Sequence, residues 1–187
     1  MTINVHKTAI QIEERLRLAT DLSPKELQSA FSLTAKLRSQ LIGIIHEQKH
    51  GDLWAENVNG KSSGKVVTLT ISEPLPSMKE LTASMQDYWL ELIHAAIKTA
   101  STRQKLPYFD KSFVLIEIIT PKYSDNLQLW DTSNRAINLI INNLKGIFFD
   151  DDNFEHMAFG VVGKWGGIGQ TIIQIMPYER LREMAKI

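Results

Sequence analysis

Residues 131–152 read DTSNRAINLIINNLKGIFFDDD, and this stretch decides how the rest of the chain is interpreted. Its pattern predicts a helix with its N-cap among Asp131, Thr132 and Ser133 and its end at Gly146, where glycine can adopt the left-handed turn. Between these ends, apolar residues recur at helical spacing and predict one buried stripe, formed by Ala136, Ile137, Ile140, Ile141 and Leu144.

The same helix carries three asparagines on the flank of its apolar stripe. Asn134, Asn138 and Asn142 are each four positions apart, and residues at that spacing lie one above another on a helix. We therefore expect the three amides to form a single polar ladder along the helix.

Three consecutive aspartates, Asp150, Asp151 and Asp152, follow the apolar end of this stretch. Their mutual repulsion must be offset by solvation, by a basic partner or by a divalent cation. Mg²⁺ binds carboxylate oxygens and keeps several waters, so two or three carboxylates from separate elements suffice. A solvated acidic turn is the simpler alternative. Asp131 adds a further carboxylate at the other end of the predicted helix. This favours a Mg²⁺ site formed by Asp131, Asp151 and Asp152.

Composition limits the classes of partner that the chain can have. The 187 residues fit one domain with an extension or two small units, and 21 Lys and Arg balance 21 Asp and Glu. A DNA partner would therefore need a locally basic face. The absence of cysteine excludes disulfides and thiolate metal sites. With neither a signal-peptide core nor an apolar run long enough to span a bilayer, we expect a cytoplasmic protein without membrane contact.

Residues 1–60 are predicted to form a helical hairpin and a linker. Ser23 as N-cap, Pro24 at the first helical position and Glu26 in the first turn are a strong start signal for the second helix, which continues to about residue 50. The apolar face of the hairpin either covers the following domain or forms a dimer surface. Asn, Gly and Ser residues predict a linker over residues 51–64.

Residues 61–187 are predicted to form an α+β domain with the element order β-α-β-α-β-β, in which helices pack on a mixed sheet. The first helix is expected over 78–102, after an N-cap at Ser77, and the second is the helix of residues 131–146. The strand over 113–120 is nearly all apolar, which predicts a central strand buried on both faces, with Glu117 at an edge or paired. The other strands are expected over 65–72, 154–162 and 170–176, with the last two joined as a hairpin by a Gly-rich turn.

The arrangement of these motifs resembles one known family. The motif residues are Pro74 to Ser77, Asp131, Asn134, Leu144, Gly146, Asp151, Asp152 and Lys164. Over residues 65–177 the chain is similar to the RusA-type Holliday junction resolvases, or crossover junction endodeoxyribonucleases. The resemblance implies a homodimeric, Mg²⁺-dependent endonuclease that cuts branched DNA in recombination and repair and is often encoded by phages and prophages.

Carried over to this sequence, the resemblance implies roles for seven charged residues. Asp131, Asp151 and Asp152 would bind Mg²⁺ and form the catalytic centre. The residues expected to contact DNA phosphates are Lys122, Arg135, Lys145 and Lys164.

Two alignments of the helix start are open. If Asn134 matches the asparagine of the family, Ser133 replaces the second aspartate, Ile137 replaces the helix lysine, and one extra residue is needed before Leu144. Without a gap, Asn134, Asn138 and Asn142 occupy the Asp, Lys and Asp positions. In both alignments Asp151 and Asp152 are kept and the lysine is missing.

Three functions are therefore open. The chain is an active structure-specific endonuclease, a catalytically impaired RusA-like protein that binds DNA or protein, or a regulatory partner-binding protein. The loss of negative charge on the helix motivates the second function, because Mg²⁺ affinity depends on that charge. The neutral net charge motivates the third.

Overall fold

The computed structural model describes residues 57–79, 81–102, 104–121 and 135–181, together with positions 9–12, 23, 26, 30, 33, 34, 37 and 41. The chain divides into two compact units, which are described separately. The smaller comprises Met1–Gly51 and Thr82–Tyr88, and the larger comprises Asp52–Leu81 and Trp89–Ile187. The predicted site residues Lys122, Asp131 and Asn134 lie outside the described residues.

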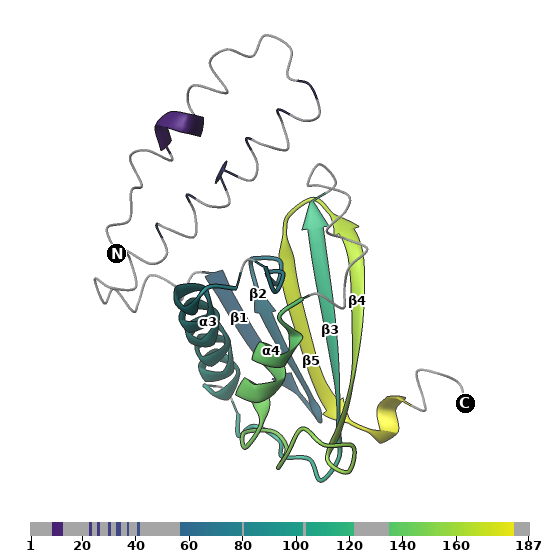
Figure 1. Cartoon of the computed structure of the whole chain (residues 1–187). Helices are drawn as coiled ribbons and strands as arrows, with labels where there is room; N and C mark the ends of the chain where they lie inside the picture. Colours follow the sequence, from purple (N-terminus) through teal and green to yellow (C-terminus); the bar gives the residue numbers. More distant parts are fainter. Residues whose placement is uncertain are drawn as a thin grey trace. The chain divides into compact units, whose positions relative to one another are not determined.

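The larger unit contains a mixed five-stranded sheet with the strand order β1-β2-β5-β3-β4 (Figure 1). The elements are β1 (Val58–Ser63), β2 (Val66–Ile71), α3 (Ala83–Ser101), β3 (Ser112–Pro121), α4 (Ile137–Leu144), β4 (Met157–Gly166) and β5 (Gln170–Pro177). Strand β3 pairs with β4 in parallel, whereas the β1–β2, β2–β5 and β5–β3 pairs are antiparallel. The predicted α+β class with a mixed sheet is confirmed.

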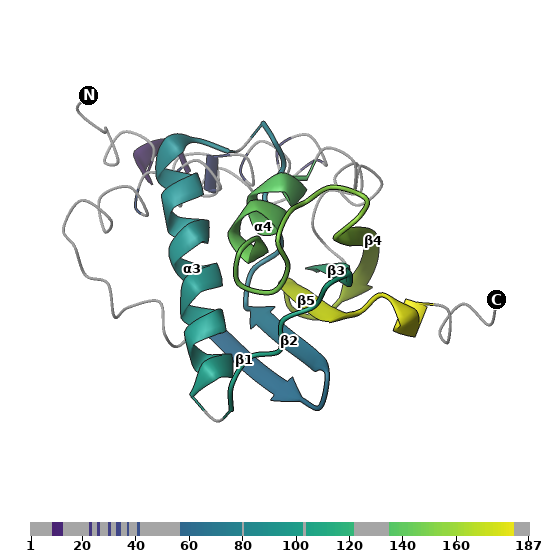
Figure 2. The same cartoon turned by 90° about the horizontal axis from the view of Figure 1, so that it is seen from below.

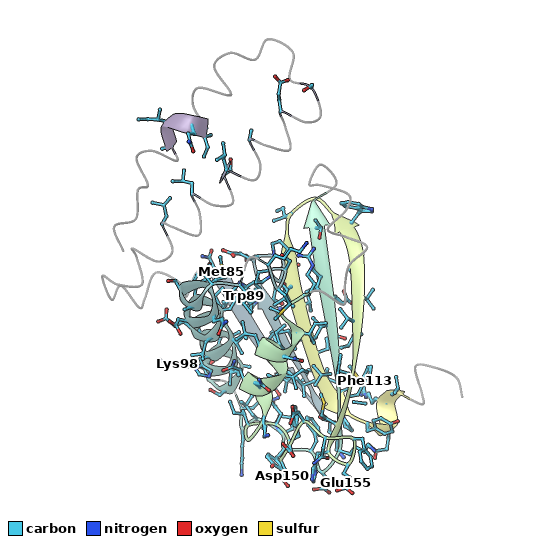
Figure 3. All side chains as sticks on the ribbon, in the orientation of Figure 1. Met85, Trp89, Lys98, Phe113, Asp150 and Glu155 are labelled. Atoms are coloured by element: carbon cyan, nitrogen blue, oxygen red, sulfur yellow. The ribbon has the colours of Figure 1, made fainter. Side chains whose placement is uncertain are left out.

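The core lies between one face of the sheet and the two helices, which cover the same side (Figure 2). Leu69, Ile173 and Ile116 lie side by side on neighbouring strands in register, and all three are fully buried. The helices contribute fully buried residues to the same core: Leu92, Ile93, Ile140 and Leu144. Figure 3 shows side chains between the helices and the sheet, with Trp89 of α3 labelled among them. Hydrophobic burial on this face therefore positions α4 and the loop that follows it.

Strand β1 lies where a linker was predicted, so the described element order is β-β-α-β-α-β-β and not β-α-β-α-β-β. Asn, Gly and Ser are poor strand formers, but pairing with β2 over its whole length overrides that local preference. At Gly60 the strand passes so close to α3 that an added Cβ would lie 2.0 Å from the carbonyl oxygen of Ala96. The glycine therefore permits a backbone contact between strand and helix.

Helix α3 begins later than predicted. The hydroxyl of Thr82 accepts a hydrogen bond from the backbone N–H of Met85 at 3.2 Å, which makes Thr82 the N-cap. Ser77, the expected cap, instead forms an isolated antiparallel bridge with Arg135. A tertiary pairing thus replaces the local capping that the sequence suggested.

Strand β3 is central, as predicted, but it separates β4 from β5. The predicted hairpin of the last two strands is therefore wrong, because β3 pairs with both of them. The prediction that β3 is buried on both faces is also wrong. Ile116 and Ile118 are buried against the helices, whereas Leu115 and Ile119 on the other face are only partly buried. Glu117, expected at an edge or paired, forms an ion pair with Lys164 of β4.

In the smaller unit, the described positions 9–12, 26, 30, 33, 34, 37 and 41 are helical. The predicted start signal at Ser23 is confirmed as a capping box. The backbone N–H and hydroxyl of Ser23 donate to the carboxylate of Glu26 at 2.8 and 2.6 Å, and the N–H of Glu26 approaches the Ser23 hydroxyl at 3.4 Å. The hairpin as a whole lies outside the described residues, and the division into domains 1–60 and 61–187 stays a prediction.

Candidate functional site

The acidic residues follow a tight turn that closes α4. The N–H of Lys145 donates to the carbonyl oxygen of Ile141 at 3.2 Å, and Gly146 adopts the left-handed conformation (φ 75°), so the predicted helix end is confirmed. The N–H of Gly146 then donates to the carbonyl oxygen of Phe149 at 2.7 Å. Phe148 and Phe149 are fully buried. With its two phenylalanines anchored in the core, the chain returns to the surface at the aspartates, which together with Asn153 we call the acidic loop (residues 150–153).

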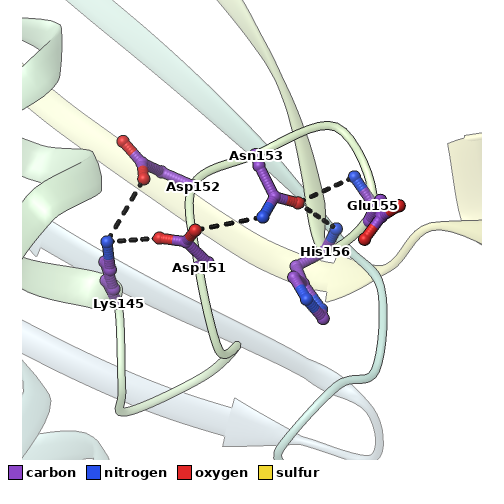
Figure 4. A network of polar contacts seen from close by, with 6 residues as sticks. All are labelled: Lys145, Asp151, Asp152, Asn153, Glu155 and His156. Carbon is purple, nitrogen blue, oxygen red and sulfur yellow. Dashed lines mark hydrogen bonds and ion pairs between the residues drawn. The ribbon is translucent and has the colours of Figure 1, made fainter.

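Two carboxylates of the acidic loop meet at one cation (Figure 4). The ammonium group of Lys145 forms an ion pair with Asp151 and lies 3.4 Å from Oδ1 of Asp152. The three side chains are 45%, 41% and 46% exposed, respectively. Of the three ways to offset the repulsion between the aspartates, the structure shows a basic partner.

This ion pair shifts the protonation of both partners. The hydrogen bond from Lys145, aided by the backbone N–H of Asp152, lowers the pKa of Asp151 to about 2. In turn, the carboxylates of Asp151 and Asp152 raise the pKa of Lys145 above its usual value. Asp151 is therefore ionised throughout the neutral pH range.

Asn153 orients Asp151 from the other side. Its Nδ2 donates to Oδ2 of Asp151 at 3.0 Å, while its Oδ1 accepts hydrogen bonds from the backbone N–H groups of Glu155 at 2.9 Å and His156 at 3.3 Å. Asn153 is not among the residues predicted from the sequence to form the site. An Asn after an acidic run is a signal for a turn closed by its own side chain.

The first aspartate faces a different partner. Asp150 accepts a hydrogen bond from the hydroxyl of Tyr108, which raises the pKa of Tyr108. The backbone N–H of Phe109 donates to the carbonyl oxygen of Phe148 at 2.8 Å, so the two segments are held together at this point. The three aspartates are thus divided between two partners, and only Asp151 and Asp152 converge.

The other predicted DNA-contact residues do not gather at the acidic loop. Lys164 lies in β4, seven residues after Met157, where the strand begins. At the rise of an extended strand, the two residues are roughly 23 Å apart. Lys164 forms its ion pair with Glu117. Arg135 is buried, with 7% of its surface exposed, and its guanidinium donates to the carbonyl oxygen of Leu75. Of the described basic candidates, only Lys145 lies beside the aspartates.

The predicted asparagine ladder is not formed on one helix. The predicted start of this helix near Asp131 is wrong, because α4 begins at Ile137. Its N-cap is Ala136, which makes no side-chain capping hydrogen bond. The bridge between Arg135 and Ser77 occupies the backbone just before it. Asn138 and Asn142 are exposed on α4, one turn apart, whereas Asn134 precedes the helix and lies outside the described residues.

Asp151 and Asp152 have the ligand chemistry of a hard cation site. Their oxygens suit Mg²⁺, which often takes one or two carboxylates and completes its shell with water and phosphate oxygens. The described part of the chain contains no group of three or more His, Cys, Asp or Glu residues that could hold a metal ion, and Asp131 lies outside it. No helix within that part is long and apolar enough to cross a membrane. No family model matches the chain, and no curated protein or solved structure matches it.

Proposed function

We propose that this chain is a RusA-type, Mg²⁺-dependent endonuclease specific for branched DNA such as Holliday junctions, with its catalytic carboxylates in the acidic loop. The observation that carries the proposal is the convergence of Asp151 and Asp152 on one positive charge, the Lys145 ammonium group. A pair of carboxylates that already shares a monovalent cation is arranged to share a divalent one.

The acidic loop supplies ligands that need little rearrangement. Asp151 is ionised at neutral pH, so no proton has to be displaced when a cation binds. Asn153 restrains the same carboxylate through its 3.0 Å hydrogen bond. Asp131 would supply the third carboxylate that the resemblance implies.

Lys145 would change partners when a cation takes its place between the carboxylates. Its side chain is 45% exposed, so the ammonium group can turn toward a DNA phosphate beside the loop. Bound Mg²⁺ would supply a polarised phosphoryl oxygen and a water of lowered pKa. Lys122 is the other basic candidate for phosphate contact, and the enzyme would act as a homodimer in recombination or repair in the cytoplasm, with a phage or prophage origin.

Cleavage of synthetic four-way junctions in Mg²⁺ or Mn²⁺ tests the proposal. We expect Asp151→Asn and Asp152→Asn to abolish cutting and Asn153→Ala to reduce it roughly 10- to 100-fold, as loss of a residue that orients a metal ligand does. Glu155→Gln is the matched control, because it removes one negative charge next to the loop while its carboxylate lies outside the contacts with Lys145 (Figure 4). Wild-type protein that leaves junctions uncut, or Asp151→Asn that cuts as well as wild type, would contradict the endonuclease.

The alternative is a RusA-like protein that binds branched DNA or a protein without cutting. Asn138 and Asn142 favour it, because one alignment places these exposed amides where the family has a lysine and an aspartate. A binder of this kind would shift junction DNA in a gel without cleaving it, and its affinity would fall steeply with salt.

A further inference from the structure

Strand β4 forms one edge of the sheet, and within the described residues no strand pairs with its outer side. The N–H of Ser112 in β3 donates to the carbonyl oxygen of His156 at 2.8 Å, which sets the phase of the parallel β3–β4 ladder. In that phase every second residue from Ala158 onward directs its backbone groups to β3. The residues between them direct theirs outward: Phe159, Val161, Gly163 and Trp165.

Within its own residues, strand β4 lacks two common forms of protection against pairing. Edge strands are commonly blocked by proline or by an unpaired lysine. Strand β4 contains no proline, and its single lysine, Lys164, is held by Glu117 on the sheet face. Apolar side chains are also exposed on both faces of the strand, since Phe159 is 51% and Val162 is 45% exposed.

We propose that β4 pairs antiparallel with β4 of a second copy of this chain. The two-fold axis is perpendicular to the sheet and passes midway between the two Val162 residues. Residues at equal distances on either side of Val162 then lie opposite each other on the same face of the sheet. Phe159 of each copy lies opposite Trp165 of the other, so two cross-strand aromatic pairs form. All the outward-directed backbone groups named above find partners.

The remaining pairs fit the same register. Val161 lies opposite Gly163, and Lys164 lies opposite Gly160, so each larger side chain faces a glycine and no like charges are opposed. Moving the axis by one residue, to Val161, would place Phe159 opposite Gly163 and would lose both aromatic pairs. Strand β4 is thus complementary to itself in this register. That favours a second copy of the chain over an unrelated strand as the partner, because a two-fold interface must be self-complementary.

The inference gives the homodimer of the proposed function a specific interface, but it does not depend on DNA cleavage. The test uses the full chain, which has no cysteine, so one introduced thiol reports a single contact. Across a non-hydrogen-bonded antiparallel pair the Cα atoms lie about 4.5 Å apart, within the range of a disulfide. The two copies of residue 161 would lie about 9 Å apart, which is too far.

In sedimentation experiments at rising protein concentration, we expect the wild-type protein to become dimeric by about 100 µM. Under mild oxidation, Val162→Cys should form at least ~10-fold more disulfide-linked dimer than Val161→Cys, which is the matched control from the neighbouring position. Circular dichroism of both variants verifies that the fold is kept. A monomer throughout the concentration range, or equal cross-linking of the two variants, would overturn the interface, and neither result bears on whether the protein cuts DNA.

Discussion

The guanidinium of Arg135 donates a hydrogen bond from Nη1 to the backbone carbonyl oxygen of Leu75 at 2.8 Å, across 60 positions of the sequence. Next to it, the N–H of Ala136 donates to the carbonyl oxygen of Pro76 at 3.1 Å, and Ser77 is bridged to Arg135. Arg135 and Leu75 are both buried. The start of α4, and with it the position of the acidic loop, is therefore held by a segment that precedes α3.

Replacing Arg135 with lysine should destabilise the larger unit by about 1–3 kcal/mol, because a lysine cannot reproduce the planar guanidinium and leaves a buried carbonyl with a poorer donor. Denaturant-induced unfolding measures the change. The control is Arg180→Lys, at an exposed position, which should alter the free energy of unfolding by less than about 0.5 kcal/mol. Equal effects of the two substitutions would show that the contact with Leu75 does not stabilise the fold.

Gly60→Ala should lower the free energy of unfolding strongly, because an added methyl group would collide with the backbone of α3. The new Cβ would lie 2.0 Å from the carbonyl oxygen of Ala96 and 2.6 Å from the backbone nitrogen of Ala100, and neither backbone atom can move without shifting the helix. We expect a loss of roughly 3 kcal/mol or more, at the upper end for overpacking. Gly167→Ala, where an added Cβ meets nothing within 4 Å, serves as the control. Thermal unfolding that is unchanged by Gly60→Ala would contradict the close approach of β1 and α3.

Lys145→Gln should raise the pKa of Asp151 from about 2 toward its ordinary value of 3.8, because the hydrogen bond from Lys145 is the largest cause of the shift. The carboxyl-carbon chemical shift in an NMR titration reports this pKa. Lys164→Gln breaks a different ion pair and should leave the titration of Asp151 unchanged. An Asp151 that still titrates near pH 2 without Lys145 would contradict the assigned cause.

The same shift predicts how stability depends on pH. The folded-state pKa of Asp151 is lowered, so the contribution of its ion pair is fully present above pH 3.8 and is lost as the pH falls through about 2. The difference in unfolding free energy between wild type and Lys145→Gln should therefore be constant near neutral pH and shrink in that acid window. Because both side chains are about half exposed, added salt should also reduce this difference. A difference that instead grew toward acid pH would show that the sign of the linkage is wrong.

Ser23→Ala should lower the stability of the helix that begins after Ser23 by about 1 kcal/mol. The substitution removes the hydroxyl that donates to the Glu26 carboxylate and accepts from the Glu26 N–H in the capping box. Far-UV circular dichroism during thermal unfolding measures the loss. Thr34→Ala is the control, since the hydroxyl of Thr34 donates to Ala30 within the helix and caps nothing. In an NMR titration, the pKa of Glu26, lowered by its hydrogen bonds to Ser23, should rise once the hydroxyl is removed. A Ser23→Ala variant as helical and as stable as wild type would contradict this role.

Elements governed by neighbouring residues could be predicted from the sequence. The capping box at Ser23, the buried stripe through Ile140 and Leu144, and the end of α4 at Gly146 each depend on residues within one or two helical turns. The acidic loop was predictable as a site of converging charge, although its basic partner Lys145 was expected to contact DNA.

Elements governed by distant residues could not be predicted in the same way. Strand β1 has a poor strand composition and forms because β2 pairs with it and α3 leaves room at Gly60. Strands β4 and β5 are separated by a short glycine-rich connection that is typical of a hairpin, yet β3 pairs with both. The residues next to Arg135 in the sequence do not indicate its hydrogen bond to Leu75, because Leu75 lies 60 positions away.

The sequence by itself determined the α+β class, the apolar faces and the place where negative charge gathers, because hydrophobic periodicity and turn residues act over a few positions. Only the tertiary structure decided which strands are neighbours, where α4 begins, and that Lys145 and not a more distant cation joins Asp151 to Asp152. Those outcomes depend on which of many compatible surfaces bury one another, and that choice is made by the packed core as a whole.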